Sequence, residues 1–89
     1  MTIDTEQLKK KIIYRSNYRG TKEMDKLLGA FTAKYINRLN KEDLIYLEKF
    51  LDIDDSNLYN FYNGLNIDVK IENNNISQLF KNFKYEEER

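Results

Sequence analysis

The sequence of 89 residues contains no cysteine, no histidine and no proline. Without cysteine, the chain has no disulfide, no thiolate nucleophile and no thiolate ligand for a metal, a composition that fits a reducing compartment. Without histidine, it also lacks the side chain that most often acts as a general base or binds a metal. Catalysis would have to rest on carboxylates, lysine or tyrosine. We expect no catalytic residue, no metal site and no enzyme activity.

Acidic and basic residues are equal in number, fifteen of each, so the formal net charge is zero. Proteins that bind nucleic acids or anionic membranes usually carry an excess of basic residues, and this chain has none. No apolar run is long enough to span a membrane, and residues 1–15 lack the apolar segment of a secretory signal. We therefore expect a cytoplasmic protein, monomeric when free, that binds neither nucleic acid nor membrane.

The charges are unevenly distributed along the chain. Basic residues crowd its first quarter and acidic residues its middle and tail: Lys9, Lys10, Lys11, Arg15, Arg19 and Lys22 against Asp52, Asp54, Asp55, Glu86, Glu87 and Glu88. Two patches of opposite sign suggest contact with a protein surface of mixed charge. A solvated helix face and a charged tail would give the same distribution.

The length and the apolar pattern favour one small helical domain. A chain of 89 residues has room for one core, which buries roughly 60–65% of the surface of the unfolded chain. Apolar residues recur at steps of three and four, the period of an amphipathic helix. We expect an all-α protein with five helices, near residues 4–15, 21–39, 40–51, 54–62 and 76–83.

Polar caps and glycines mark the ends of these segments: Asp4 or Thr5, Gly20, Asn40, Asp54, Asp55 and Gly64. Residues 65–75 read as a loop. Its apolar residues Ile67, Val69 and Ile71 alternate as in a strand, but a single strand would have no partner. We expect residues 1–3 and 85–89 to be flexible termini of the single domain.

The segment NYRGTKEMDKLL at 17–28 places an Arg-Gly pair between two predicted helices. Gly20 stands at the turn, where glycine reaches positive φ without steric cost. Glu23 falls in the first turn of the next helix, where the helix dipole favours a carboxylate. Arg19 lies outside both apolar stripes, so its guanidinium is either solvated or able to meet the carboxylate or backbone of a partner. Taken alone, each of the three residues has a simple structural explanation.

Taken together, these residues resemble a known family. The stretch RGTKE at 19–23 fits the RGxxE motif of the succinate dehydrogenase flavinylation factors, also called FAD assembly factors. The resemblance runs from about Tyr14 to Lys84 and includes YLEKFLDIDDSNLYNFY at 46–62, with its leucine-rich helix, acidic pair and aromatic residues. Three features depart from the family pattern. Thr21 replaces a methionine, Phe61 replaces a tryptophan, and the proline of the following loop is missing.

The resemblance implies a five-helix bundle that binds the flavoprotein subunit of succinate dehydrogenase, or of fumarate reductase, and promotes covalent attachment of FAD to a histidine of that subunit. The absence of histidine from this chain agrees with a linkage made on the partner. No cofactor is then held stably by the chain itself. By position, Arg19, Gly20, Glu23, Asp54 and Asp55 would face the partner, although Asp54 and Asp55 are equally suited to cap a helix.

Two other classes of function stay open. In the first, the chain is a small module that binds FAD and delivers it, with Tyr14, Tyr18 or Tyr62 stacked on the flavin. Aromatic residues at helical spacing belong more often to a core, and no phosphate-binding loop is present. In the second, the basic first helix binds nucleic acid, which the zero net charge and the lack of a reading helix disfavour.

Overall fold

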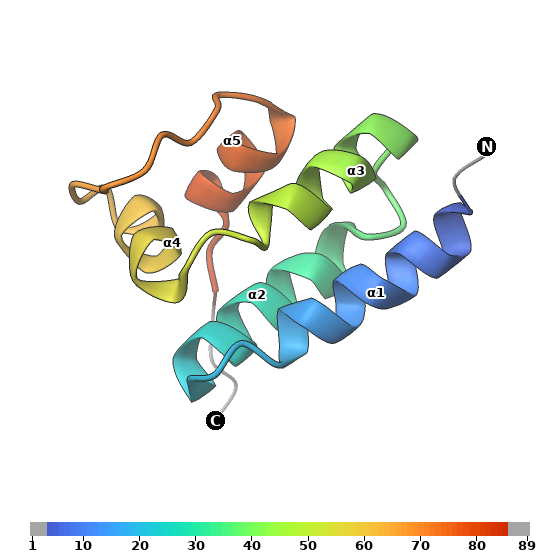
Figure 1. Cartoon of the computed structure of the whole chain (residues 1–89), viewed down its shortest axis with the longest axis horizontal. Helices are drawn as coiled ribbons and strands as arrows, with labels where there is room; N and C mark the ends of the chain where they lie inside the picture. The colour runs from blue at the N-terminus through green and yellow to red at the C-terminus, as the bar shows by residue number, and fades with distance from the viewer. Residues whose placement is uncertain (1–3, 86–89) are drawn as a thin grey trace.

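Five helices make up the regular structure of residues 4–85, the part of the chain that the computed structural model describes (Figure 1). They are α1 (Thr5–Asn17), α2 (Lys22–Tyr35), α3 (Lys41–Phe50), α4 (Asp55–Tyr62) and α5 (Asn75–Asn82). No strand occurs among these residues, so the predicted all-α class is confirmed. Of the termini that we expect to be flexible, residues 1–3 and 86–89 lie outside the described part.

Each helix begins after a residue whose side-chain oxygen accepts a hydrogen bond from the first turn: Asp4, Thr21, Asn40, Asp54 and Asn74. Such caps satisfy backbone N–H groups that have no partner within the helix. The cap of α5 is reciprocal, because Ser77 Oγ also accepts from the backbone N–H of Asn74 at 2.9 Å. The sequence prediction placed Asn74 in a loop and missed this capping box.

The helices pack so that α1 contacts α2 and α3, while α5 contacts α3 and α4. In Figure 1, α4, α5 and the loop between them lie on the other side of α3 from α1. The turn between α1 and α2 and the connector between α3 and α4 are joined by hydrogen bonds. This meeting point positions the candidate site.

An aromatic cluster fills the core. Phe80 on α5 meets Phe31 of α2 and Phe50 of α3 edge to face, with ring centroids 5.3 and 5.4 Å apart. This geometry is favourable for aromatic pairs beyond the area they bury. Aliphatic residues of all five helices complete the core: Leu8, Ile12, Leu27, Leu28, Leu44, Leu47, Leu58 and Ile76.

Two predicted helix ends are wrong. The expected helix over 21–39 ends at Tyr35, and a turn over residues 36–38 follows, in which the Arg38 N–H donates to Tyr35 O. The apolar spacing misled the prediction because Ile36 is still buried and Leu39 still packs against the core from the turn. Phe83, expected in the last helix, lies just beyond α5 in extended conformation and is buried.

The loop between α4 and α5 is irregular, as expected, and contains no strand. Asn57 on α4 holds the middle of this loop, because Asn57 Oδ1 accepts from the Asp68 N–H at 2.9 Å. Beyond α5, Tyr62 Oη donates to Phe83 O at 2.6 Å and accepts from the Tyr85 N–H at 3.4 Å. Tyr85, which the sequence analysis assigned to a flexible end, packs against the core.

Candidate functional site

Gly20 occupies the turn between α1 and α2 with a φ of +124°. L-residues rarely adopt this conformation, so the prediction of a glycine-dependent turn is confirmed. The residue is exposed, and a Cβ atom built on it would meet no other atom within 4 Å. The turn therefore presents bare backbone to the surface.

Arg19 points its guanidinium inward, and its side chain is only 10% exposed. Nε donates to Asp55 Oδ1 at 2.9 Å, Nη1 to Leu51 O at 2.5 Å and Nη2 to Ile53 O at 2.7 Å. The backbone N–H of Arg19 donates to the carboxylate of Asp25 in α2. One residue thus joins the α1–α2 turn to the α3–α4 connector.

Carbonyl groups at the end of a helix lack partners within the helix, and a cation is favoured there. Leu51 follows the last residue of α3, so the guanidinium meets this need while it also neutralises Asp55. The sequence could not show this arrangement, because the bonded residues lie 32 to 36 positions apart. Contact between Arg19 and a partner stays a prediction. In the free protein, the guanidinium forms three hydrogen bonds within the chain.

The two adjacent aspartates have different roles. Asp54 is exposed and caps α4, accepting from the Asn57 N–H at 3.2 Å and from Asn57 Nδ2 at 2.7 Å. These hydrogen bonds, the side-chain one foremost, hold the pKa of Asp54 below its ordinary value because they stabilise the carboxylate. Asp55 instead pairs with Arg19 and is about one quarter exposed. The acidic pair is therefore brought together with Arg19, through Asp55.

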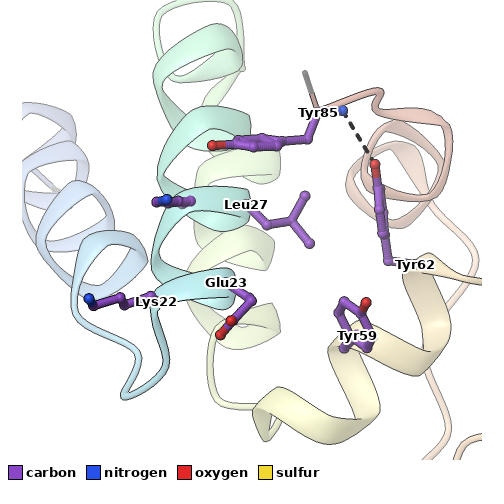
Figure 2. Close-up of a pocket in the computed structure, with 7 residues that line it drawn as sticks. Lys22, Glu23, Leu27, Tyr59, Tyr62 and Tyr85 are labelled. Atoms are coloured by element: carbon purple, nitrogen blue, oxygen red, sulfur yellow. Dashed lines mark hydrogen bonds between the residues drawn. The ribbon is translucent and has the colours of Figure 1, made fainter. Parts of the chain in front are cut away.

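Glu23 is exposed on the first turn of α2, and within residues 4–85 its carboxylate forms no ion pair. It borders a cleft of about 380 Å³ between α2 and α4, lined by Lys22, Glu23, Lys26, Leu27, Tyr59, Tyr62 and Tyr85. Figure 2 shows Glu23 and Leu27 on the side of α2 that faces Tyr59 and Tyr62, with Lys22 directed away from them. The cleft is thus lined in part by apolar and aromatic side chains, and Glu23 places a carboxylate at its edge.

A second hollow of about 250 Å³ adjoins the cleft. Its lining comprises Thr21, Glu23, Met24, Asp55, Ser56 and Tyr59, so Glu23 and Tyr59 border both spaces. The sequence analysis did not single out Tyr59. The sequence signal for Tyr59 is its position next to Leu58: Leu58 is fully buried, whereas Tyr59 is 49% exposed.

The tyrosines considered for flavin stacking do not form one site. Tyr14 and Tyr18 pack on each other on the outer face of α1, with ring centroids 4.7 Å apart, beside a separate hollow lined by Lys10, Ile13 and Asn17. Tyr62 lines the cleft between α2 and α4. Among residues 4–85, no three acidic side chains come together as metal ligands, and no helix has the length and apolarity to cross a membrane.

Comparison with known proteins identifies relatives over most of the chain. Residues 10–84 match the family model Sdh5, described as flavinator of succinate dehydrogenase. The mitochondrial succinate dehydrogenase assembly factor 2 of Lodderomyces elongisporus is 32% identical over 99% of this chain and 55% of its own length. The same factor of Aspergillus flavus is 36% identical over 63% of this chain and 19% of its own length. No solved structure matches the chain.

The aligned region spans between about a fifth and just over half of the length of these relatives. They are named assembly factors and not enzymes, in agreement with the prediction that the chain is not an enzyme. The cytoplasmic prediction is wrong, because the relatives are named mitochondrial. It rested on a composition without cysteine or long apolar runs, and those features are compatible with either compartment.

Proposed function

The chain belongs to the Sdh5 family of succinate dehydrogenase flavinators, and from this premise we propose that it binds the flavoprotein subunit of succinate dehydrogenase and promotes covalent attachment of FAD to that subunit. The names of the relatives support a mitochondrial site of action. Fumarate reductase, whose flavoprotein subunit would present the same task, is a second client in this proposal. The free factor acts as a monomer.

The observation that carries the proposal, besides family membership, is the surface around the α1–α2 turn. Gly20 exposes backbone without a side chain, and Glu23 exposes a carboxylate without an ion pair in the described part of the chain. Arg19 and Asp55 hold this turn against the α3–α4 connector. A surface held in place in this way can bind one conformation of a partner selectively, because the surface itself loses little conformational entropy on binding.

In this proposal the factor contributes shape and charge, and the partner contributes the reacting groups. The flavoprotein subunit holds FAD and the histidine that receives it, and the bound factor stabilises the conformation in which the two are aligned for attack. The chain has no histidine or cysteine that could accept the flavin in place of the partner. FAD therefore stays with the flavoprotein subunit throughout.

The test is covalent flavin fluorescence of the flavoprotein subunit in a denaturing gel, after its expression with the wild-type chain, without it, or with a Gly20 variant. Gly20→Ala and Gly20→Arg impose the same positive-φ strain, and neither Cβ meets another atom. They differ in how far the new side chain projects from the turn. Gly20→Ala therefore controls for folding in the comparison with Gly20→Arg.

We expect fluorescence that depends on the wild-type chain, persists in large part with Gly20→Ala and is lost with Gly20→Arg. Equal fluorescence with and without the wild-type chain would contradict the flavinator role. Equal fluorescence with the two variants would remove Gly20 from the partner surface and leave the flavinator role standing.

A further inference from the structure

Glu23 and Tyr59 line both of the adjoining hollows beside the α1–α2 turn. The larger space contains lysines as well as Glu23, whereas the ionisable groups that line the smaller one are two carboxylates and a tyrosine. Asp55 is neutralised there by Arg19. Among residues 4–85, Glu23 is the carboxylate lining the smaller hollow that forms no ion pair.

The helix termini next to this hollow do not reverse the negative sign of its net charge. Both α2 and α4 begin here, and each N-terminus carries roughly half a positive charge. Against these stand the carboxylates of Glu23, Asp55 and the exposed cap Asp54. Within residues 4–85, the ion pair of Asp55 with Arg19 is the only one that these three carboxylates form. Because the pKa of Asp54 is lowered, that carboxylate is ionised at neutral pH. The balance favours a cation.

The aromatic wall of the hollow narrows the class of cation. Tyr59 is about half exposed and lines this hollow together with Glu23. A planar guanidinium can stack on such a ring and at the same time form two hydrogen bonds to a carboxylate, whereas an ammonium group has no flat face. Figure 2 shows Lys22 directed away from Glu23 and Tyr59, so its ammonium group does not compete for the Glu23 carboxylate.

We propose that an arginine side chain of the flavoprotein subunit enters the hollow, stacks on Tyr59 and pairs with Glu23. The inference rests on the proposed function, since it names the chemistry of the client at the same surface. It gives Tyr59 a partner-binding role alongside Glu23. It also explains why Arg19 is turned inward: the guanidinium that the surface uses comes from the partner.

The experiment measures the dissociation constant of the complex with the flavoprotein subunit at two salt concentrations, for the wild-type chain and for Glu23→Gln, Tyr59→Leu and Tyr59→Phe. Glu42→Gln is the matched control for Glu23, because Glu42 is also an exposed carboxylate in the first turn of a helix. Tyr14→Leu is the matched control for Tyr59, because Tyr14 is an exposed tyrosine on the outer face of α1.

We expect Glu23→Gln to weaken binding about tenfold at low salt and to reduce the salt dependence that the wild type shows. Tyr59→Leu should weaken binding about three- to tenfold, and Tyr59→Phe less, because phenylalanine keeps the ring. The two control variants should bind like the wild type.

Wild-type affinity and salt dependence for Glu23→Gln and Tyr59→Leu would overturn this inference while the flavinator role survives. Weakening of the same size in the control variants would overturn it too, because the effect would then not be specific to the hollow. A wild-type chain that neither binds nor flavinylates the subunit would overturn the proposed function, and the inference with it.

Discussion

Arg19 and Asp55, 36 positions apart in the sequence, are joined by a hydrogen-bonded ion pair in which Nε donates to Oδ1 at 2.9 Å. The same guanidinium donates to the carbonyl groups of Leu51 and Ile53. The α1–α2 turn and the α3–α4 connector are therefore parts of one structure. Substitution of Arg19 or of Asp55 should therefore change the stability of both the turn and the connector.

The first prediction concerns the stability that Arg19 contributes. Arg19→Leu leaves the Asp55 carboxylate and two carbonyl groups without their donor, and we expect it to lower the free energy of unfolding by about 2–4 kcal/mol. Arg19→Lys should recover only part of this, because an ammonium group cannot reach three acceptors in the same directions. Urea unfolding measures the difference.

Arg15→Leu is the control for Arg19. Arg15 also donates to a carbonyl and an aspartate, Glu48 O and Asp52 Oδ1, but it pairs with a largely exposed carboxylate. Its loss should cost about 0.5–1 kcal/mol. Equal costs at the two positions would contradict the view that Arg19 is the main link between the two connectors.

The second prediction separates strain from crowding at Gly20. Gly20→Ala should lower the free energy of unfolding by about 1–2 kcal/mol, because the positive φ is unfavourable for alanine although the surrounding space is open. Gly20→Asn should cost about as much as alanine, because asparagine tolerates the left-handed region near a φ of about +57° and Gly20 lies at +124°. Thermal unfolding measures both variants, and wild-type stability in either would contradict the strain.

The third prediction concerns acid. The folded state holds the pKa of Asp54 below the ordinary value of 3.8, so its stabilising effect is complete above that value and is lost as the pH falls through the lowered pKa. Asp54→Asn keeps a capping side chain that does not titrate. Below about pH 4, the melting temperature of the wild type should fall more steeply than that of Asp54→Asn. Parallel melting curves down to about pH 2 would contradict the assignment.

The fourth prediction concerns the contact between α1 and α2 at Gly29. A Cβ atom at this helical position would lie 2.5 Å from Asn17 Oδ1, at the end of a side chain whose Nδ2 donates to Ile13 O. Gly29→Ala alone should therefore be close to neutral, because the gain in helix propensity is offset by displacement of Asn17. In an Asn17→Ala background the same change should stabilise the protein by about 0.5–1 kcal/mol.

A double-mutant cycle on Asn17 and Gly29, measured by urea unfolding, gives the coupling between them. Additive effects would show that the Asn17 side chain moves aside at no cost.

Most of the fold could be predicted because it is encoded locally. Apolar residues at helical spacing identified the buried faces of α2 and α3, and cap residues such as Asp54 marked helix starts. The end of α2 could not be read in this way, since Ile36 is buried from a turn just as it would be from a helix. Periodicity reports which side chains are buried and leaves the backbone undetermined.

Of the residues singled out from the sequence, the structure joins Arg19 to Asp55, but it also brings in Tyr59, which was not predicted. Gly20 could be assigned to a turn because its conformational freedom is a property of the residue itself. The inward direction of Arg19 depends on acceptors that come from another part of the chain, and the exposure of Tyr59 depends on how α4 is rotated against the core. Neither is encoded within a few residues of the position concerned.

The acceptors of the Arg19 guanidinium lie 32 to 36 positions away along the chain. Closing loops of this length costs entropy that only the assembled fold offsets, so we expect these bonds to form late during folding. A folding intermediate that contains only α1 and α2 would have the turn without its anchor. Amide hydrogens around the turn should then exchange with solvent by global unfolding and not by local fraying. In the proposed function, the surface that meets the flavoprotein subunit would thus exist only in the completely folded chain.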